Sequence, residues 1–145
     1  MISIRPMITE DIQPSQQLLS ELGYPLETKE LRRRYDSVMG TADHALLVAE
    51  DEGHIIALCH VYARPALDKP PEAVVQALVV DRACRGLGVG RDMMMAAETW
   101  ASDHGFTSEA LYSNAVRSGA HAFYETIGYR HTATSHMFRK SLDQR

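Results

Sequence analysis

The sequence is poor in every feature that marks a secreted, membrane or nucleic-acid-binding protein. Two cysteines in 145 residues, Cys59 and Cys84, form neither a metal-ligand spacing nor a disulfide framework, so we expect free thiols and no metal site. No apolar run approaches the ~20 residues that span a bilayer, and Arg5, Glu10 and Asp11 rule out a signal-peptide pattern. The net charge of -4 argues against general nucleic-acid binding. We therefore expect a cytoplasmic protein with no membrane or nucleic-acid partner.

The hydrophobic residues, 45% of the chain, suffice for one compact core at this length. No linker, repeat or low-complexity tract divides the sequence. We therefore expect a single domain over residues 1–145.

Strand-like and helix-like runs alternate along the chain. Strands are expected at 2–5, 45–50, 55–62, 74–80, 110–113 and 131–140. Helices are expected at 11–22, from Thr28 as N-cap to Gly40 as terminator, at 89–104 and at 118–127. This order predicts a mixed α/β fold: a largely antiparallel sheet with a parallel pair at its centre, formed by the strands on either side of the helix at 89–104.

The most informative motif, Arg-Gly-Leu-Gly-Val-Gly, lies between the strand at 74–80 and the helix at 89–104. Alternate glycines let a backbone approach a ligand closely, and amide protons ahead of a helix N-terminus attract phosphate. Arg85 and Arg91 flank the glycines with two cationic side chains. The motif predicts a phosphorylated ligand, and a glycine-rich turn without a ligand is the alternative.

The motif also excludes two common phosphate sites. A dinucleotide fingerprint that starts at Gly86 needs glycine where Arg91 stands. A triphosphate loop needs Gly-Lys-Ser/Thr, but Gly90 is followed by Arg91 and Asp92. A nicotinamide fold and a kinase or ATPase loop are both disfavoured.

A second block follows at 113–129, with Asn114, Arg117, Ala120-His121, Phe123-Tyr124-Glu125 and Gly128-Tyr129. Together the two blocks resemble the Arg/Gln-x-x-Gly-x-Gly/Ala loop and the Asn-x-x-Arg-x-x-Ala-His-x-Phe-Tyr-Glu segment of the GNAT family of N-acetyltransferases. The resemblance covers nearly the whole chain and is most specific between Gln76 and Tyr129. It implies the GNAT fold, a mixed, mostly antiparallel sheet with a splayed parallel strand pair and about four flanking helices.

The resemblance implies acetyl-CoA as the cofactor, with its pantetheine arm added to the central strand like a further strand. The residues implied in cofactor binding are Leu78, Val79, Val80, Arg85, Gly86, Leu87, Gly88, Val89, Gly90, Arg91, Asn114, Arg117 and Tyr124. Tyr124 matches the family tyrosine that protonates or stabilises the leaving thiolate, and a satisfied structural tyrosine is the alternative.

The proton acceptor for the amine is less well defined. Many relatives carry a glutamate on the central strand where this chain has Gln76, which cannot accept the proton. Glu72, His60 and Tyr62 are the candidates near the expected substrate mouth, and Glu72 and His60 are the two expected to act through ordered water. A structural role for His60 is the alternative.

The substrate implied by the resemblance is a primary amine, which we expect to be a small molecule. Tyr24, Tyr35, Tyr62, Arg64 and Gln76 are the expected acceptor-side residues. Aminoglycosides, polyamines, amino-terminal peptides and amines that carry a phosphonate or carboxylate stay open as substrates. A coenzyme A-binding module without transfer activity is the alternative from another class, and a structural protein ranks third. A homodimer through the C-terminal strands is a further family expectation.

Overall fold

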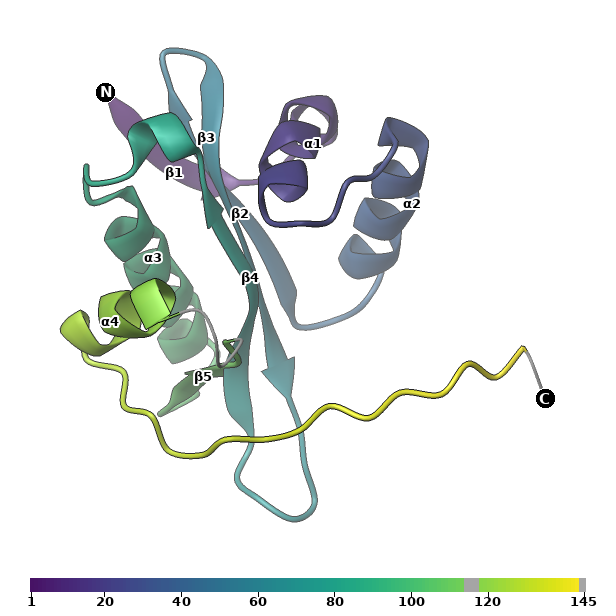
Figure 1. Ribbon diagram of the computed structural model, residues 1–145, viewed down its shortest axis with the longest axis vertical. Helices are drawn as coiled ribbons and strands as arrows, with labels where there is room; N and C mark the ends of the chain where they lie inside the picture. The colour runs from purple at the N-terminus through teal and green to yellow at the C-terminus, as the bar shows by residue number, and fades with distance from the viewer. Residues whose placement is uncertain (114–117, 144–145) are drawn as a thin grey trace. The chain divides into compact units, whose positions relative to one another are not determined.

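The computed structural model describes residues 1–113 and 118–143 of the chain. The chain divides into two compact units, Met1–Tyr112 and Ser113–Arg145, which we describe separately. The first unit holds a mixed sheet with helices on both of its faces (Figure 1). No helix among the described residues is long and apolar enough to cross a membrane.

The sheet of the first unit follows the order of the sequence, β1-β2-β3-β4-β5. The pairs from β1 to β4 are antiparallel and only β4 and β5 run parallel. The mixed, mostly antiparallel sheet with one parallel pair is therefore confirmed. Because β5 ends the described sheet, this pair lies at its edge and not at its centre. The bounds are β1 Ile2–Pro6, β2 His44–Asp51, β3 His54–Arg64, β4 Glu72–Val80 and β5 Glu109–Leu111.

Three helices cover this sheet. The helices α1 (Ile12–Glu21) and α2 (Thr28–Met39) contact one face, and α3 (Val89–Asp103) contacts β2, β3 and β4. Figure 1 shows α3 on the side of the sheet opposite α1 and α2. The predicted helix bounds are confirmed to within about two residues, but Thr28 is not the N-cap. That position is Glu27, and the Thr28 hydroxyl instead donates a hydrogen bond to Gln16 Oε1 at 2.9 Å.

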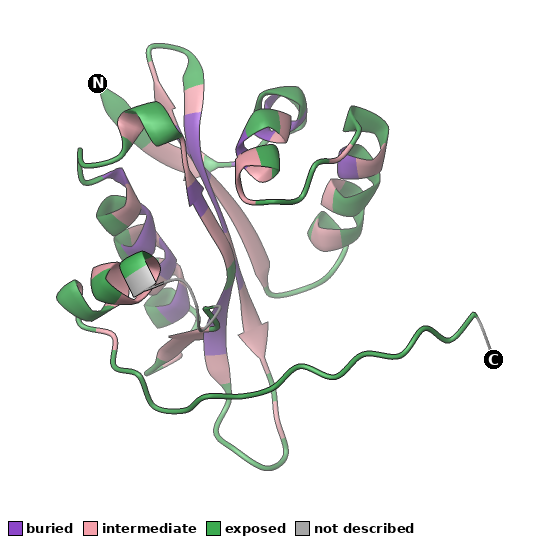
Figure 2. Cartoon of the chain, viewed as in Figure 1, coloured by how far each residue is buried: buried purple, intermediate pink, exposed green. Residues whose placement is uncertain are grey.

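Apolar side chains fill both interfaces between the sheet and its helices. Figure 2 shows the buried residues concentrated along the middle strands and on α3. The α3 interface buries Met93, Met94 and Ala97, three residues at helical spacing. The cluster under α1 and α2 contains Met7, Ile12, Leu18, Leu31, Val48, Leu58 and Val79.

A partly buried ion pair, with Asp11 buried and Arg5 about 30% exposed, joins β1 to the beginning of α1. Arg5 Nη1 and Nη2 donate to the two carboxylate oxygens of Asp11, at 2.8 and 2.9 Å, and Arg5 Nε donates to Glu50 at 2.8 Å. These hydrogen bonds hold the pKa of Asp11 below its usual value, although burial alone would raise it. Asp11 is the buried partner, so its charge depends on the Arg5 guanidinium for compensation.

The second unit contains α4 (Ser118–Thr126), followed by Gly128 with a positive φ of 101°. The expected strand at 131–140 is wrong, because this segment is fully exposed and forms no strand pairing with the described residues. Its sequence pattern gives strand propensity, but a strand also needs a hydrogen-bonded neighbour. Met137 and Phe138 are 80% and 91% exposed on this segment.

Candidate active site

The central strand β4 changes its pairing halfway along its length. Its register with β3 joins Ala77 to His60 and then Val75 to Val61, so that Gln76 is an extra residue without a partner. An extra residue of this kind is a β-bulge, which bends the strand and reverses the side to which the following residues point. The bulge at Gln76 therefore divides β4 into two halves of different geometry.

Among the described residues, no strand pairs with the outer edge of β4 after the bulge, and we call this edge open. The parallel pairing with β5 covers only residues 73–75. The amide of Asp81 donates to the Ile56 carbonyl of β3 at 2.7 Å. Because backbone groups alternate in direction along a strand, Val79 also points towards β3, while Leu78 and Val80 present their N–H and C=O groups to the open edge. Two of the three predicted strand residues are thus available for main-chain pairing with a ligand.

The glycine loop follows directly from this open half. Asp81 Oδ1 accepts a hydrogen bond from the Ala83 amide at 2.9 Å and so fixes the first turn after β4. Gly86 and Gly88 both have positive φ, 86° and 81°, and a Cβ atom at either position would meet nothing within 4 Å. Glycine at these two positions therefore permits the left-handed backbone conformation, and the lack of side chains leaves open space beside the loop.

Gly88 is the N-cap of α3, so the first amides of this helix have no intrahelical partner. In the part of the chain that the structure describes, the amides of residues 86–88 donate no backbone hydrogen bond either. Arg85 and Arg91 are exposed, and neither forms an ion pair with a described residue. Free amides, a helix N-terminus and two uncompensated guanidinium groups fit the phosphate groups predicted for this loop.

A hollow of about 480 Å³ lies where the β3–β4 hairpin meets the end of α2. Tyr62 and Arg64, two of the predicted acceptor-side residues, line it together with His44 and Asp43. Arg64 pairs with Glu72 at 3.1 Å, and the Nε atom of Arg64 is buried without a hydrogen-bond partner. The hollow therefore combines aromatic and other apolar surface with charges of both signs, which suits a small molecule that carries both apolar and polar groups.

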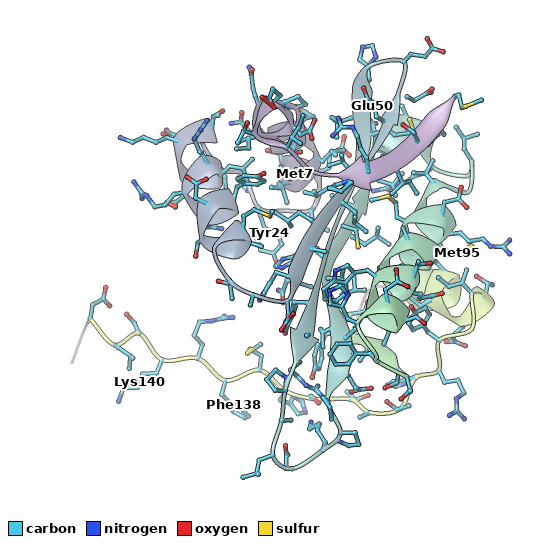
Figure 3. All side chains as sticks on the ribbon, turned by 180° about the vertical axis from the view of Figure 1, so that it is seen from behind. Met7, Tyr24, Glu50, Met95, Phe138 and Lys140 are labelled. Carbon is cyan, nitrogen blue, oxygen red and sulfur yellow. The ribbon has the colours of Figure 1, made fainter. Side chains whose placement is uncertain are left out.

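The other two predicted acceptor-side tyrosines lie apart from this hollow. Tyr24 is exposed in the connection between α1 and α2 (Figure 3). Tyr35 is half-buried on α2, and its hydroxyl donates to the Met7 carbonyl at 3.4 Å. Neither lines the hollow, so the structure brings together only Tyr62 and Arg64 of the four side chains predicted outside β4.

The candidates for the proton acceptor differ in how far existing hydrogen bonds already occupy them. Glu72 is engaged by Arg64 at 3.1 Å and by the Ser108 hydroxyl at 3.0 Å, which leaves its carboxylate largely committed. His60 lies opposite Ala77, the first residue after the bulge. Burial, with a smaller contribution from His44, lowers the pKa of His60 to about 4, so its imidazole is neutral at pH 7. Gln76 is exposed at the bulge.

His44 was missed by the sequence analysis. Its Nδ1 atom lies 2.9 Å from His60 Nε2, and its ring stacks on Tyr62 with centroids 5.0 Å apart. A second bulge, where the β2–β3 register shifts between Ala49 and Glu50, brings His44 opposite Tyr62. If the β2–β3 pairing is extended from the hairpin turn without this bulge, His44 is placed on the other face of the sheet. The sequence analysis could therefore have identified His44 only by predicting the register shift.

The remaining predicted residues belong to the second unit. Tyr124 is half-buried on α4, and its ring makes edge contacts with Phe123 and Tyr129 at centroid distances of 5.1 and 6.1 Å. The predicted cofactor residues Asn114 and Arg117 lie outside the described residues.

Comparisons with known proteins agree with this geometry. The model of the Acetyltransferase (GNAT) family matches residues 7–129. The aminoglycoside 6'-N-acetyltransferase AAC(6')-IG from Acinetobacter haemolyticus is 19% identical, with a TM-score of 0.85 and coverage of 97% of this chain and 99% of that one. A putative acetyltransferase from Agrobacterium tumefaciens is 24% identical, with a TM-score of 0.86 and coverage of 95% and 99%.

A third structure, the aminoglycoside N-acetyltransferase AAC(6')-Iy in complex with CoA, is 17% identical with a TM-score of 0.88 and covers 97% of this chain and 95% of its own. A comparison with curated protein sequences found no match. At these identities the structural likeness shows a shared fold, while the family model covers most of the chain. The chain belongs to the Acetyltransferase (GNAT) family and is an N-acetyltransferase that uses acetyl-CoA.

Proposed function

We propose that the protein transfers the acetyl group of acetyl-CoA directly to a primary amine of a small molecule, with residues 1–145 acting as one catalytic domain. The observation that carries the proposal is the continuous path from the open half of β4 to the free amides of the glycine loop. Acetyl-CoA supplies an acetyl thioester, whose C–S bond is exchanged for a C–N bond on the acceptor.

The main-chain groups of Leu78 and Val80 are suited to pair with the pantetheine amides, as an added strand would. The amides of residues 86–91 and the side chains of Arg85 and Arg91 are suited to hold the pyrophosphate. The positive end of the α3 dipole adds about 0.3–1 kcal/mol to an anion at this place. Asn114 and Arg117 complete the proposed cofactor side.

Tyr124 is proposed to act on the leaving group. A phenol within hydrogen-bond reach of the sulfur protonates the thiolate or stabilises its developing charge. Replacing Tyr124 with phenylalanine keeps the ring contacts with Phe123 and Tyr129 and removes only the hydroxyl. We expect Tyr124→Phe to lower kcat by about 10²-fold, the lower end for acid–base catalysis, while the KM for acetyl-CoA changes little. An unchanged kcat in a steady-state assay rejects the role.

The acceptor amine must lose a proton. An alkylammonium group with a pKa of ~10.4 is neutral in only about one molecule in 2,500 at pH 7, which costs about 4.6 kcal/mol. The nitrogen of the neutral amine releases a further proton as the C–N bond forms. Of the two proposed acceptors of that second proton, His60 is favoured over Glu72, because the Glu72 carboxylate already accepts hydrogen bonds from Arg64 and Ser108.

A small polar amine is the proposed substrate class. The hollow near Tyr62 and Arg64 supports it by its size and by its mixed charges. Two of the similar structures are aminoglycoside acetyltransferases, and one of these relatives, AAC(6')-Iy, is described with an acetylneamine bisubstrate analogue. We therefore propose an aminoglycoside-like or polyamine-like amine before an amino-terminal peptide.

Thermal unfolding with acetyl-CoA, with NAD and ATP as controls, tests the cofactor. A ligand at a hundred times its dissociation constant adds about 2.7 kcal/mol to the free energy of unfolding. An increase in Tm with acetyl-CoA alone supports the proposal, and no increase at millimolar concentration contradicts it. Free thiol release with neamine, spermidine and an alanyl peptide as acceptors then tests the substrate class. Acetylation of the peptide alone overturns the small-molecule proposal.

A coenzyme A-binding module without transfer is the second candidate, and the glutamine at position 76 favours it. The same assays separate the two, because such a module increases in Tm with acetyl-CoA but releases no thiol with any amine.

A homodimer formed through the segment at 131–140 is also proposed, supported by the exposure of Met137 and Phe138 there. Sedimentation equilibrium of the full chain and of the variant Phe138→Asp tests it, and a monomeric full chain contradicts it.

A further inference from the structure

Three ring side chains form a cluster across β2 and β3. His44 Nδ1 and His60 Nε2 lie 2.9 Å apart, and Tyr62 stacks on the His44 ring at an interplanar angle of 10°. The His60 and Tyr62 ring centroids are 5.9 Å apart. Ring contacts on two sides and one hydrogen bond leave the imidazoles little freedom to rotate.

The cluster lies between the hollow and the open half of β4. His44 and Tyr62 line the hollow. His60 is the cross-strand neighbour of Ala77, and directly opposite residues have Cβ atoms about 4.5–5.5 Å apart. Ala77 carries only a methyl group, so its side chain takes up little of the space beside the His60 ring. Within the first unit, the cluster therefore lies between the proposed acceptor site and the half of β4 that is proposed to pair with pantetheine.

The hydrogen bond between the two imidazoles defines what they can do with a proton. A neutral imidazole has one N–H and one lone pair, and the shared bond uses one of each from the pair. Of the two remaining ring nitrogens, His60 Nδ1 and His44 Nε2, one is then a donor and the other an acceptor. A proton taken up at one end can leave at the other after the shared hydrogen shifts. Two hydrogen-bonded neutral imidazoles thus form a short proton relay.

We propose that His44 and His60 form the proton relay for the acceptor amine, with His60 as the proton acceptor and His44 as its positioning residue. This inference rests on the proposed function. The amine nitrogen loses one proton, which bonds to His60 Nδ1, and the shared hydrogen passes from His60 Nε2 to His44 Nδ1. The hydrogen on His44 Nε2 then leaves to water, so one proton enters the relay and one leaves it.

The electrostatic environment fits this role. The lowered pKa of His60, about 4, keeps the ring neutral and its lone pair available at pH 7. A base this weak takes the proton only as the C–N bond forms, when the amine nitrogen becomes acidic, so transfer and attack are coupled. The other titratable groups on this part of β3 and β4 are Cys59, whose pKa burial raises to about 12, Tyr62, beside the pair, and the Arg64–Glu72 ion pair farther along.

The test compares His60→Ala and His44→Phe, assayed by thiol release with neamine and spermidine. We expect His60→Ala to lower kcat by about 10²-fold, with an unchanged KM for acetyl-CoA and partial recovery in added imidazole. His44→Phe keeps a ring against Tyr62 but has no ring nitrogen, and we expect a fall in kcat of about tenfold or more. If His60→Ala does not fold, His60→Gln replaces it. The matched control is His54→Phe, an exposed histidine on the same strand, which should behave as the wild type.

The outcomes separate the two proposals. Wild-type kcat in His44→Phe shows a packing role for that ring and overturns the relay, as does wild-type kcat in His60→Ala. A reduced kcat in His60→Ala that imidazole cannot raise also overturns it. If the wild-type protein acetylates neither amine, the small-amine function fails, and the relay fails with it.

Discussion

The two halves of β4 have the same kind of residue composition but different neighbours. The half at 72–75 pairs with β3, and its residues 73–75 also pair with β5; Ala73, Val74 and Val75 are almost completely buried. Among the described residues, the half at 76–80 pairs with β3 alone, through residues 77–80, and Gln76 is exposed. The backbone of the first half is therefore held by a neighbouring strand on each side, whereas the second half retains outward groups for a ligand. Substitutions in the first half should therefore change stability, and substitutions in the second should change binding.

The largest effect is expected for Val74→Asp in the paired half. Val74 is 1% exposed, so the carboxylate would be buried without a cation. Removing one partner of a buried ion pair costs about 3–5 kcal/mol, and we expect at least this loss here for the same reason, an uncompensated buried charge. Chemical denaturation followed by circular dichroism measures it. A free energy of unfolding within 1 kcal/mol of wild type would show that the paired half is not part of the core.

The second prediction concerns the loop that continues the open half. Gly88→Glu puts a side chain at a φ of 81° and an anion beside the amides proposed to hold phosphate. A left-handed backbone costs a non-glycine residue about 1–2 kcal/mol. We expect a modest loss of stability and a fall in acetyl-CoA affinity of about 100-fold, equivalent to about 2.7 kcal/mol. Isothermal titration calorimetry tests this, with the exposed, positive-φ Gly53→Glu as the control. If Gly88→Glu binds acetyl-CoA with the affinity of the wild type, the loop does not hold the phosphate groups of this ligand.

The bounds of the helices and of most strands could be predicted from the sequence because they depend on local periodicity. Met93 and Ala97 recur at helical spacing on α3, and both are fully buried. The two bulges could not be predicted, since a bulge is a property of a strand and its partner together. The sequence drew attention to Gln76 as a departure from the family glutamate, but it did not indicate that Gln76 is the extra residue of a bulge in β4.

The candidate site shows the same limit. The glycine loop was predicted from contiguous residues, and the structure gives it the expected open backbone. His44 lies 16 residues before His60, and the register shift at Ala49 and Glu50 was needed to bring the two rings together. The expected strand at 131–140 failed because sequence pattern gives propensity without naming the neighbour that a strand requires.

A third prediction tests which backbone groups point outwards. Val80→Pro removes an amide proposed to face the open edge, where proline is tolerated in a strand. We expect a folded protein that binds acetyl-CoA about tenfold more weakly. This change corresponds to about 1.4 kcal/mol, which is close to the contribution of one hydrogen bond. Val79→Pro is the matched control, because its amide points to β3 and its side chain lies in the core. Val79→Pro should therefore lower the free energy of unfolding by more than Val80→Pro does. Equal effects of the two prolines on Tm and on affinity would contradict the assigned directions.

The smallest effect is expected for Gln76→Glu at the bulge itself. Gln76 is exposed and unpaired in the register, so the free energy of unfolding should change by less than about 0.5 kcal/mol. Its consequence should become visible only when the proposed relay is broken. In a His60→Ala background the new carboxylate, next to Ala77 in the chain, offers a substitute proton acceptor, so kcat should recover in part. Gln76→Asn in the same background is the control and should restore nothing. Recovery with both residues, or with neither, would show that proton transfer does not occur at the bulge.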